Sequence, residues 1–296
     1  LESEELLRLV WEQILDYTVA DSNEIATNQR YYPELRIAFD ISPREPLAWA
    51  FPAGKDHSLI DKAEEYFAAL TSSGRLEQLL ERYYGHISSF DYVATRRYIK
   101  HIEQRLPRYK TWFEQAAEET GQDWRLLAAI GYQESHWDPN AVSPTGVRGI
   151  MMLTKAAMKQ LDMSGDRIDP RTSIFGGARY IHRSRKKIPA RIAEPDRTWM
   201  ALAAYNIGYG HLEDARILTE NAGDNPDQWV DVKKYLPLLN QKEWYKKTRH
   251  GYARGQAPVR YVENVRSYYD ILVRLDEREN MQQPPSPVLN IKSPAL

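Results

Sequence analysis

The chain has 296 residues, which at roughly 100 to 200 residues per domain predicts two domains, each large enough for its own core. Its 40 Lys and Arg nearly balance its 41 Asp and Glu, so no overall field attracts nucleic acid or an anionic membrane. No apolar run approaches the ~20 residues that span a bilayer, and the absence of cysteine excludes disulfides, thiolate catalysis and cysteine metal sites.

Residues 1–88 alternate between short β-like runs and helical patterns, which predicts an α/β module. The β-like runs cover residues 17–20, 35–39 and 47–51, and prolines interrupt the sequence around them. Apolar spacing predicts two helices between residues 58 and 84, separated by Ser73-Gly74. Since so few strands make a poor sheet on their own, we expect residues preceding Leu1 in the natural protein to complete this module.

Beyond residue 88 the strand signals end, and amphipathic helices follow one another to about residue 275. The charge-rich residues 89–107 predict a helix that connects the two halves. Residues 108–278 predict an all-α domain, and the proline-rich residues 279–296 predict a disordered tail. The sequence therefore predicts an α+β multidomain protein in which the second domain is entirely helical.

A candidate general acid stands at the end of one predicted helix. Residues 124–134 are apolar almost all round, which predicts a helix buried inside the second domain. Glu134 ends this run, where desolvation and the negative end of the helix dipole would raise the pKa of its carboxyl. Ser135 could orient that carboxyl by a hydrogen bond. The alternative is that Glu134 only marks where the helix emerges into solvent before Asp138-Pro139 ends it.

Two other segments place glycines beside helical patterns. In one, Gly146 and Gly149 precede a helix, which permits close backbone approach to a substrate or to a neighbouring helix. The alternative there is a turn followed by a buried methionine pair. In the other, Tyr205 and Asn206 could present a hydroxyl and an amide to a cleft, although the pattern equally fits a helix C-cap.

Five motifs stand in a characteristic order along the second half. They are Glu134-Ser135, Gly146-x-x-Gly149-x-Met151, Asp169-Pro170 with Gly177 and Tyr180, Ala204-Tyr205-Asn206-x-Gly208, and Tyr261-Val262 with Val265. The ordered set, over residues 108–275, resembles the soluble lytic transglycosylases, relatives of goose-type lysozyme. This resemblance implies a lysozyme-like all-α fold with Glu134 as the catalytic residue. It also implies substrate-binding positions at Ser135, Ser143, Gly149, Met151, Tyr205, Asn206 and Tyr261.

The resemblance implies an unusual reaction, because most glycosidases use two carboxylates and this motif set supplies one. Glu134 would protonate a glycosidic oxygen of peptidoglycan while the N-acetyl group of the muramoyl residue serves as nucleophile. The same carboxylate would then take the proton of the muramoyl C6 hydroxyl, giving a 1,6-anhydro product. Two alternatives are a lysozyme-type hydrolase on the same fold and a non-catalytic wall or solute sensor.

The sequence departs from the family pattern at two places. Met152 stands where the family usually has Gln, and Ala257-Pro258 replaces the usual Glu-Thr. These departures put individual substrate contacts in doubt, but not the catalytic acid.

The first half carries a second resemblance. Residues 15–22 and 74–85 resemble the later part of an extracellular solute-binding module of the amino-acid-binding type, in which the residue matching Asp21 grips a ligand ammonium group. Asp21 is therefore a candidate residue for a regulatory ligand such as a muropeptide, and the alternative is an Asp that caps the following helix. Together the halves resemble membrane-bound lytic transglycosylases, which implies a periplasmic enzyme attached to the outer membrane.

The remaining chemistry-bearing residues give weaker signals. The histidines form no His-x-x-x-His or His-Glu-x-x-His pair, so we expect neither a zinc site nor another cofactor. The basic residues 182–187 could meet anionic wall peptides, but a solvated helix end explains them more simply.

Overall fold

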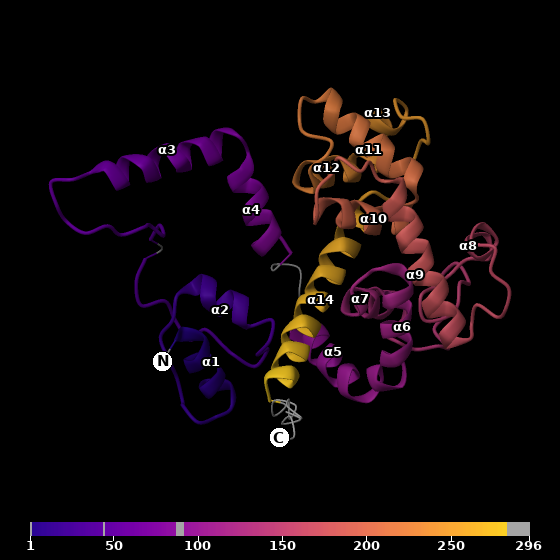
Figure 1. The fold of residues 1–296 in the computed structure, drawn as a ribbon, viewed down its shortest axis with the longest axis horizontal. Helices are drawn as coiled ribbons and strands as arrows, with labels where there is room; N and C mark the ends of the chain where they lie inside the picture. Colours follow the sequence, from indigo (N-terminus) through magenta and orange to yellow (C-terminus); the bar gives the residue numbers. More distant parts are fainter. Residues whose placement is uncertain (1, 44, 87–91, 283–296) are drawn as a thin grey trace, which may run out of the picture.

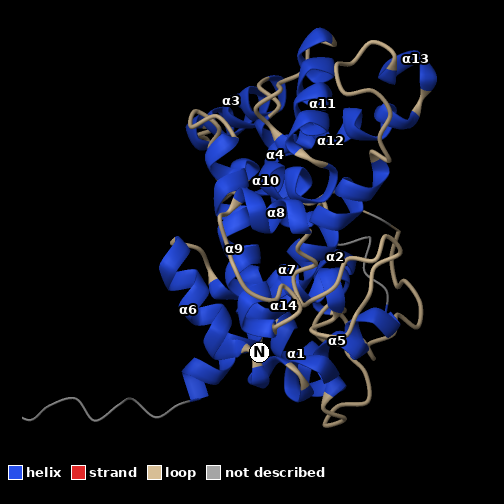
Figure 2. Ribbon diagram, turned by 90° about the vertical axis from the view of Figure 1, so that its right-hand side faces the viewer, coloured by secondary structure: helices blue, strands red, loops and turns tan. Residues whose placement is uncertain are grey.

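The computed structural model describes residues 2–43, 45–86 and 92–282, and within these ranges the regular structure is helical (Figure 2). An isolated antiparallel bridge between Val142 and Arg148 is the closest approach to a strand in the described residues. The all-α prediction for the second half is thus confirmed, whereas the α/β prediction for the first half is not.

The N-terminal part contains α1 (Ser3–Trp11), α2 (Ser22–Asn28), α3 (Ser58–Ser72) and α4 (Arg75–Tyr84). α3 and α4 confirm the two predicted helices and the break between them, where Gly74 takes a left-handed conformation with φ 70°. In Figure 1 these helices lie to one side of α14, and a long loop joins α2 to α3.

The three predicted strands are wrong, since residues 17–20, 35–39 and 47–51 are coil. Their apolar side chains are largely exposed, with Tyr17 at 84 % and Phe39 at 75 %. A strand is stabilised by main-chain hydrogen bonds to a neighbouring strand. No partner strand lies beside these runs in the described part of the chain, so local β propensity alone does not fix them as strands.

The second half starts with α5 (Tyr92–Gln104), which lies within the predicted connecting helix 89–107, and a 3-10 turn, η2 (Leu106–Arg108), which extends one residue beyond it. Residues 89–91 of that prediction lie outside the described residues. The helices that follow are α6 (Lys110–Thr120), α7 (Trp124–Ser135), α8 (Lys155–Gln160), α9 (Pro170–Lys187), α10 (Asp196–Ile207), α11 (Tyr209–Asn221), α12 (Trp229–Tyr235), α13 (Lys242–Tyr245) and α14 (Gln256–Gln282). A second 3-10 turn, η3 (Leu236–Asn240), joins α12 to α13.

The buried helix α7 is central to this domain, with α6 and α14 packed along it (Figure 1). It begins where the carboxylate of Asp123 accepts a hydrogen bond from the backbone N–H of Arg125 at 2.8 Å. Small buried residues such as Ala128 and Gly131 let its neighbours approach closely. A Cβ on Gly131 would lie 2.9 Å from the ring of Phe113 on α6.

The last helix, α14, extends further than the sequence indicates. It continues to Gln282, so the prediction of a disordered tail from residue 279 is wrong over its first four residues. Good helix formers continue as far as Pro284, the first residue that cannot continue the pattern. The rest of the predicted tail, residues 283–296, lies outside the described residues.

Charged side chains dock α4 on the helical domain. Glu81 accepts hydrogen bonds from Arg266 on α14 at 2.7 Å and from Lys233 on α12 at 2.5 Å. Gln78, one turn earlier on α4, donates to Asp196 at the start of α10 at 3.2 Å. Because Arg266 is only 2 % exposed, we expect loss of its partner to leave a costly unpaired charge.

Candidate active site

Glu134 lies one residue before the end of α7, with its carboxyl in partly buried surroundings. The hydroxyl of Tyr261, from α14, donates a hydrogen bond of 2.6 Å to Oε1 of Glu134. Burial raises the pKa of Glu134 from 4.5 to about 7, and the Tyr261 hydrogen bond opposes this rise only in part. The expected upward shift is thus confirmed, with desolvation as its main cause.

Ser135 does not orient the carboxyl in the way the sequence indicates. Its hydroxyl lies 2.9 Å from the carbonyl oxygen of Ile150, to which it donates, and 3.2 Å from that of Gly131 within α7. The side chain therefore ties the end of α7 to the segment after Gly149, and any effect on Glu134 passes through the backbone.

The segment from Gly149 to Met152 forms a tight turn, closed by a hydrogen bond of 3.1 Å from the N–H of Met152 to the carbonyl of Gly149. Gly149 has φ 98°, and a Cβ there would lie 2.5 Å from the carbonyl oxygen of Arg167. Glycine is therefore required both for the left-handed backbone and for the close approach.

Met151, predicted to bind substrate, has a fully buried side chain that packs on Gly177 of α9. The alternative of a buried core methionine is the one observed for this side chain. Its backbone is held from two helices: its N–H donates to the hydroxyl of Ser173 at 3.0 Å, and its carbonyl accepts from the hydroxyl of Tyr205 at 2.6 Å. Ser173 is a residue that the sequence motifs do not indicate.

Two tyrosines lie near Glu134, and a third packs on one of them. The rings of Tyr205 and Tyr261 are stacked, with centroids 6.3 Å apart and planes 23° apart. The ring of Tyr180 on α9 packs edge-on against Tyr205 at 5.5 Å. Burial and then the nearby charge of Glu134 raise the pKa of both Tyr205 and Tyr261 well above 10.0, so both hydroxyls stay protonated donors.

The other predicted site residues do not take part in the hydrogen bonds described around Glu134 and Met151. Asn206 is exposed near the end of α10, which stops at Ile207 before Gly208 with φ 93°. The hydroxyl of Ser143 accepts from the N–H of Val147 at 2.9 Å and so shapes its own turn. Asp21 occupies the N-cap position of α2 but makes no side-chain cap hydrogen bond, so capping does not account for it.

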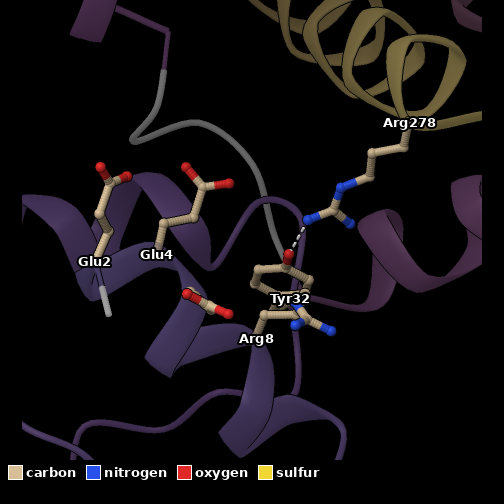
Figure 3. Close-up of a pocket in the computed structure, with 6 residues that line it drawn as sticks. Glu2, Glu4, Arg8, Tyr32 and Arg278 are labelled. Carbon is tan, nitrogen blue, oxygen red and sulfur yellow. Dashed lines mark hydrogen bonds between the residues drawn. The ribbon is translucent and has the colours of Figure 1, made fainter. Parts of the chain in front are cut away.

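Two further observations concern possible ligand sites away from Glu134. A cavity of 650 Å³, lined by Glu2, Glu4, Glu5, Arg8, Tyr32 and Arg278, lies in the N-terminal part against α14 (Figure 3). None of the residues around Glu134 lines it. Among the described residues, no group of three or more metal-ligating side chains is arranged to hold an ion.

Residues 111–228 match the family model described as the transglycosylase SLT domain. The matched residues include Glu134, Gly149 and Tyr205, whereas Tyr261 lies beyond them.

Comparison with curated proteins extends the likeness over nearly the whole chain. The chain is 57 % identical over 283 residues to membrane-bound lytic murein transglycosylase F 1 of Alkalilimnicola ehrlichii, covering 96 % of this chain and 57 % of that protein. It is 52 % identical over 277 residues to membrane-bound lytic murein transglycosylase F of Marinobacter nauticus, covering 94 % and 55 %. The chain thus spans little more than half the length of these relatives. The similarity confirms the resemblance to membrane-bound lytic transglycosylases expected from the motifs.

Among solved structures, the lytic transglycosylase Slt of Pseudomonas aeruginosa, crystallised as an inactive mutant, is 21 % identical to this chain. The match covers 60 % of this chain and 25 % of that one, with a TM-score of 0.38.

Proposed function

We propose that the protein cleaves the β-1,4 bond between N-acetylmuramic acid and N-acetylglucosamine in peptidoglycan without consuming water. Glu134 is the catalytic residue in this proposal. The observation that carries it is a partly buried carboxyl whose pKa is raised to about 7, which accepts a hydrogen bond from the Tyr261 hydroxyl and lies inside the residues that match the SLT family model. A carboxyl with such a pKa can donate a proton near neutral pH and take one back.

In the first step, the protonated Glu134 delivers its proton to the glycosidic oxygen, and the bond from that oxygen to the anomeric carbon breaks. No second carboxylate contributes to the pKa shift of Glu134, which fits a reaction with one acidic residue. The N-acetyl group of the muramoyl residue supplies the nucleophile that a second carboxylate supplies in most glycosidases.

In the second step, the ionised Glu134 takes the proton of the muramoyl C6 hydroxyl as that oxygen attacks the anomeric carbon. The N-acetyl oxygen leaves, a 1,6-anhydro ring forms, and the acid is restored. The Tyr261 hydroxyl stabilises the carboxylate between the steps, because a hydrogen bond to a charged acceptor is stronger than one to a neutral acceptor.

The other positions carried over from the family are proposed to hold the sugar. Tyr205 and Asn206 would position it beside Glu134 from the end of α10, and Gly149 would let the backbone approach it. Ser135 and the backbone of Met151 would contribute by fixing this segment. Ser143 would line the approach from its turn.

The alternative is a lysozyme-type hydrolase, and product mass distinguishes the two. The test is mass spectrometry of soluble products released from purified peptidoglycan by the wild-type chain. The proposal predicts anhydromuramoyl ends, lighter by one water than the hydrolytic products. Reducing muramoyl ends as the main product would contradict the lytic reaction, and no release at all would support the non-catalytic alternative.

The N-terminal part is proposed to be the later portion of a solute-binding module of α/β type. Asp21, exposed and free of a cap hydrogen bond, would bind the ammonium group of a muropeptide and so regulate the helical domain. Calorimetry of a full-length protein with muropeptides, beside Asp21→Ala, tests this, and binding that Asp21→Ala leaves unchanged would contradict it.

The proposed location is the periplasm, at the inner face of the outer membrane. It rests on the membrane-bound relatives and on peptidoglycan as substrate. In the ranges that the structure describes, no helix is both long and apolar enough to cross a bilayer.

A further inference from the structure

The backbone directly after Glu134 has an unusual conformation. His136 and Trp137 are consecutive left-handed residues, with φ 54° and 56°. This region is uncommon outside glycine, and for a bulky residue such as Trp it is an outlier with a cost on the order of 1–3 kcal/mol. Such a conformation persists only where the surrounding contacts impose it.

One set of contacts comes from Trp137 itself. Its indole N–H donates to the carbonyl of Ala128, in the middle of α7, at 2.8 Å. Its ring packs beside the rings of Tyr132 on α7 and Tyr98 on α5, with ring centroids 4.7 Å and 5.6 Å away. The side chain therefore folds back along the helix that it follows and reverses the chain there.

The other contact comes from outside α7. Arg105, between α5 and η2, donates through Nη1 to the carbonyl oxygen of His136 at 2.9 Å. This carbonyl belongs to the C-cap residue of α7, two positions after Glu134. The hydroxyl of Ser135 ties the same helix end to Ile150. The two residues that directly follow Glu134 are thus both held by contacts from outside α7.

We propose that Arg105 is a positioning residue for Glu134: by holding the His136 carbonyl, it fixes the turn that sets the direction of the carboxyl. The proposal rests on the proposed function, because it takes Glu134 to be the proton donor. A displacement of about 1 Å at a catalytic group can cost about 10²-fold in rate, so a distant hydrogen bond can matter for turnover.

Arg105 acts through the backbone and not through its charge. The pKa of Glu134 is set by burial and by the Tyr261 hydrogen bond, with no contribution from Arg105. A competing role is purely structural, since a cation near a helix C-terminus stabilises the helix by about 0.3–1 kcal/mol. That role changes stability alone, whereas positioning also changes turnover in protein that is fully folded.

The test compares Arg105→Ala, Arg105→Lys and the control Arg108→Ala. Arg108 lies three residues further on in η2, is exposed, and makes no side-chain hydrogen bond or ion pair among the described residues. Release of anhydromuropeptides from soluble glycan strands gives kcat and KM, at a temperature where circular dichroism shows each variant folded. Arg105→Ala is expected to lower kcat at least tenfold with KM changed by about twofold or less. Arg105→Lys keeps an N–H donor and is expected to recover most of kcat, and Arg108→Ala to retain all of it.

A second readout is the pH profile. If the turn loosens in Arg105→Ala, the carboxyl becomes better solvated and its pKa falls, so the alkaline limb of kcat/KM moves to lower pH. An unchanged kcat in folded Arg105→Ala, or an equal loss in Arg108→Ala, would overturn this proposal alone. An inactive wild type would overturn the proposed function and this proposal with it.

Discussion

Replacing Glu134 by Gln is expected to make the protein more stable at alkaline pH, because an acid whose pKa is raised by burial lowers the stability of the fold once it ionises. The pKa of Glu134 rises from 4.5 to about 7 on folding. Below pH 4.5 the carboxyl is protonated in both the folded and the unfolded chain. As pH increases, the unfolded chain loses this proton first, so the free energy of unfolding falls until the pH passes about 7. At about 1.4 kcal/mol per pKa unit, the loss amounts to about 3 kcal/mol.

Glu134→Gln lacks this titration, while its amide oxygen can still accept the hydrogen bond from Tyr261. The measurement is urea unfolding of wild type and Glu134→Gln at several pH values between 4 and 8. The difference in unfolding free energy should shift in favour of the variant by about 3 kcal/mol across this range. A control of opposite sign is Glu119→Gln, because the hydrogen bond from Arg179 lowers the pKa of Glu119 and the wild type gains its stability as pH rises. A Glu134→Gln difference that does not change with pH would refute the reasoning.

Three further substitutions and one control substitution test the site and its support. Tyr261→Phe removes a hydrogen bond that favours the ionised Glu134. At roughly 1.5–3 kcal/mol for a bond to a charged group, the alkaline limb of the activity profile should move up by about one to two pH units; an unmoved limb would count against the contact. Gly149→Ala meets both a left-handed φ and a backbone clash, so thermal unfolding should show a loss on the order of 2 kcal/mol or more. Gly146→Ala, with open space around it, should lose only about 1 kcal/mol, and equal losses would contradict the role given to the clash. Glu81→Ala should destabilise the protein by about 3 kcal/mol in urea unfolding, because it leaves the cationic side chains of Arg266 and Lys233 without this partner. A change within ~0.5 kcal/mol would show that Glu81 does not anchor α4.

The part of the site that sequence predicts is the part encoded locally. Residues 124–134 are apolar on every side, so a buried helix with Glu134 at its end follows from the pattern, and so does a raised pKa. The glycine at position 149 likewise signals a special backbone conformation, which the structure has. The role of Met151 is less local, because its side chain enters the core while its backbone is hydrogen-bonded to side chains of two other helices.

The rest depends on contacts between distant residues. The hydrogen bond from Tyr261 to Glu134 spans 127 positions of sequence, and no spacing rule indicates it without the family pattern. The end of α7 at Ser135 is contacted by a tryptophan that folds back on the helix and by an arginine that lies between α5 and η2. The predicted strand at 35–39 failed for a related reason: β propensity describes a side chain, whereas a strand needs a partner strand.

The central claim is that a single carboxyl serves first as acid and then as base. The most direct test is the rate at which purified Glu134→Gln releases anhydromuropeptides from peptidoglycan, beside the wild type under the same conditions. The account predicts a loss of roughly 10²–10⁴-fold or more with an unchanged circular dichroism spectrum. Turnover within tenfold of the wild type would contradict it.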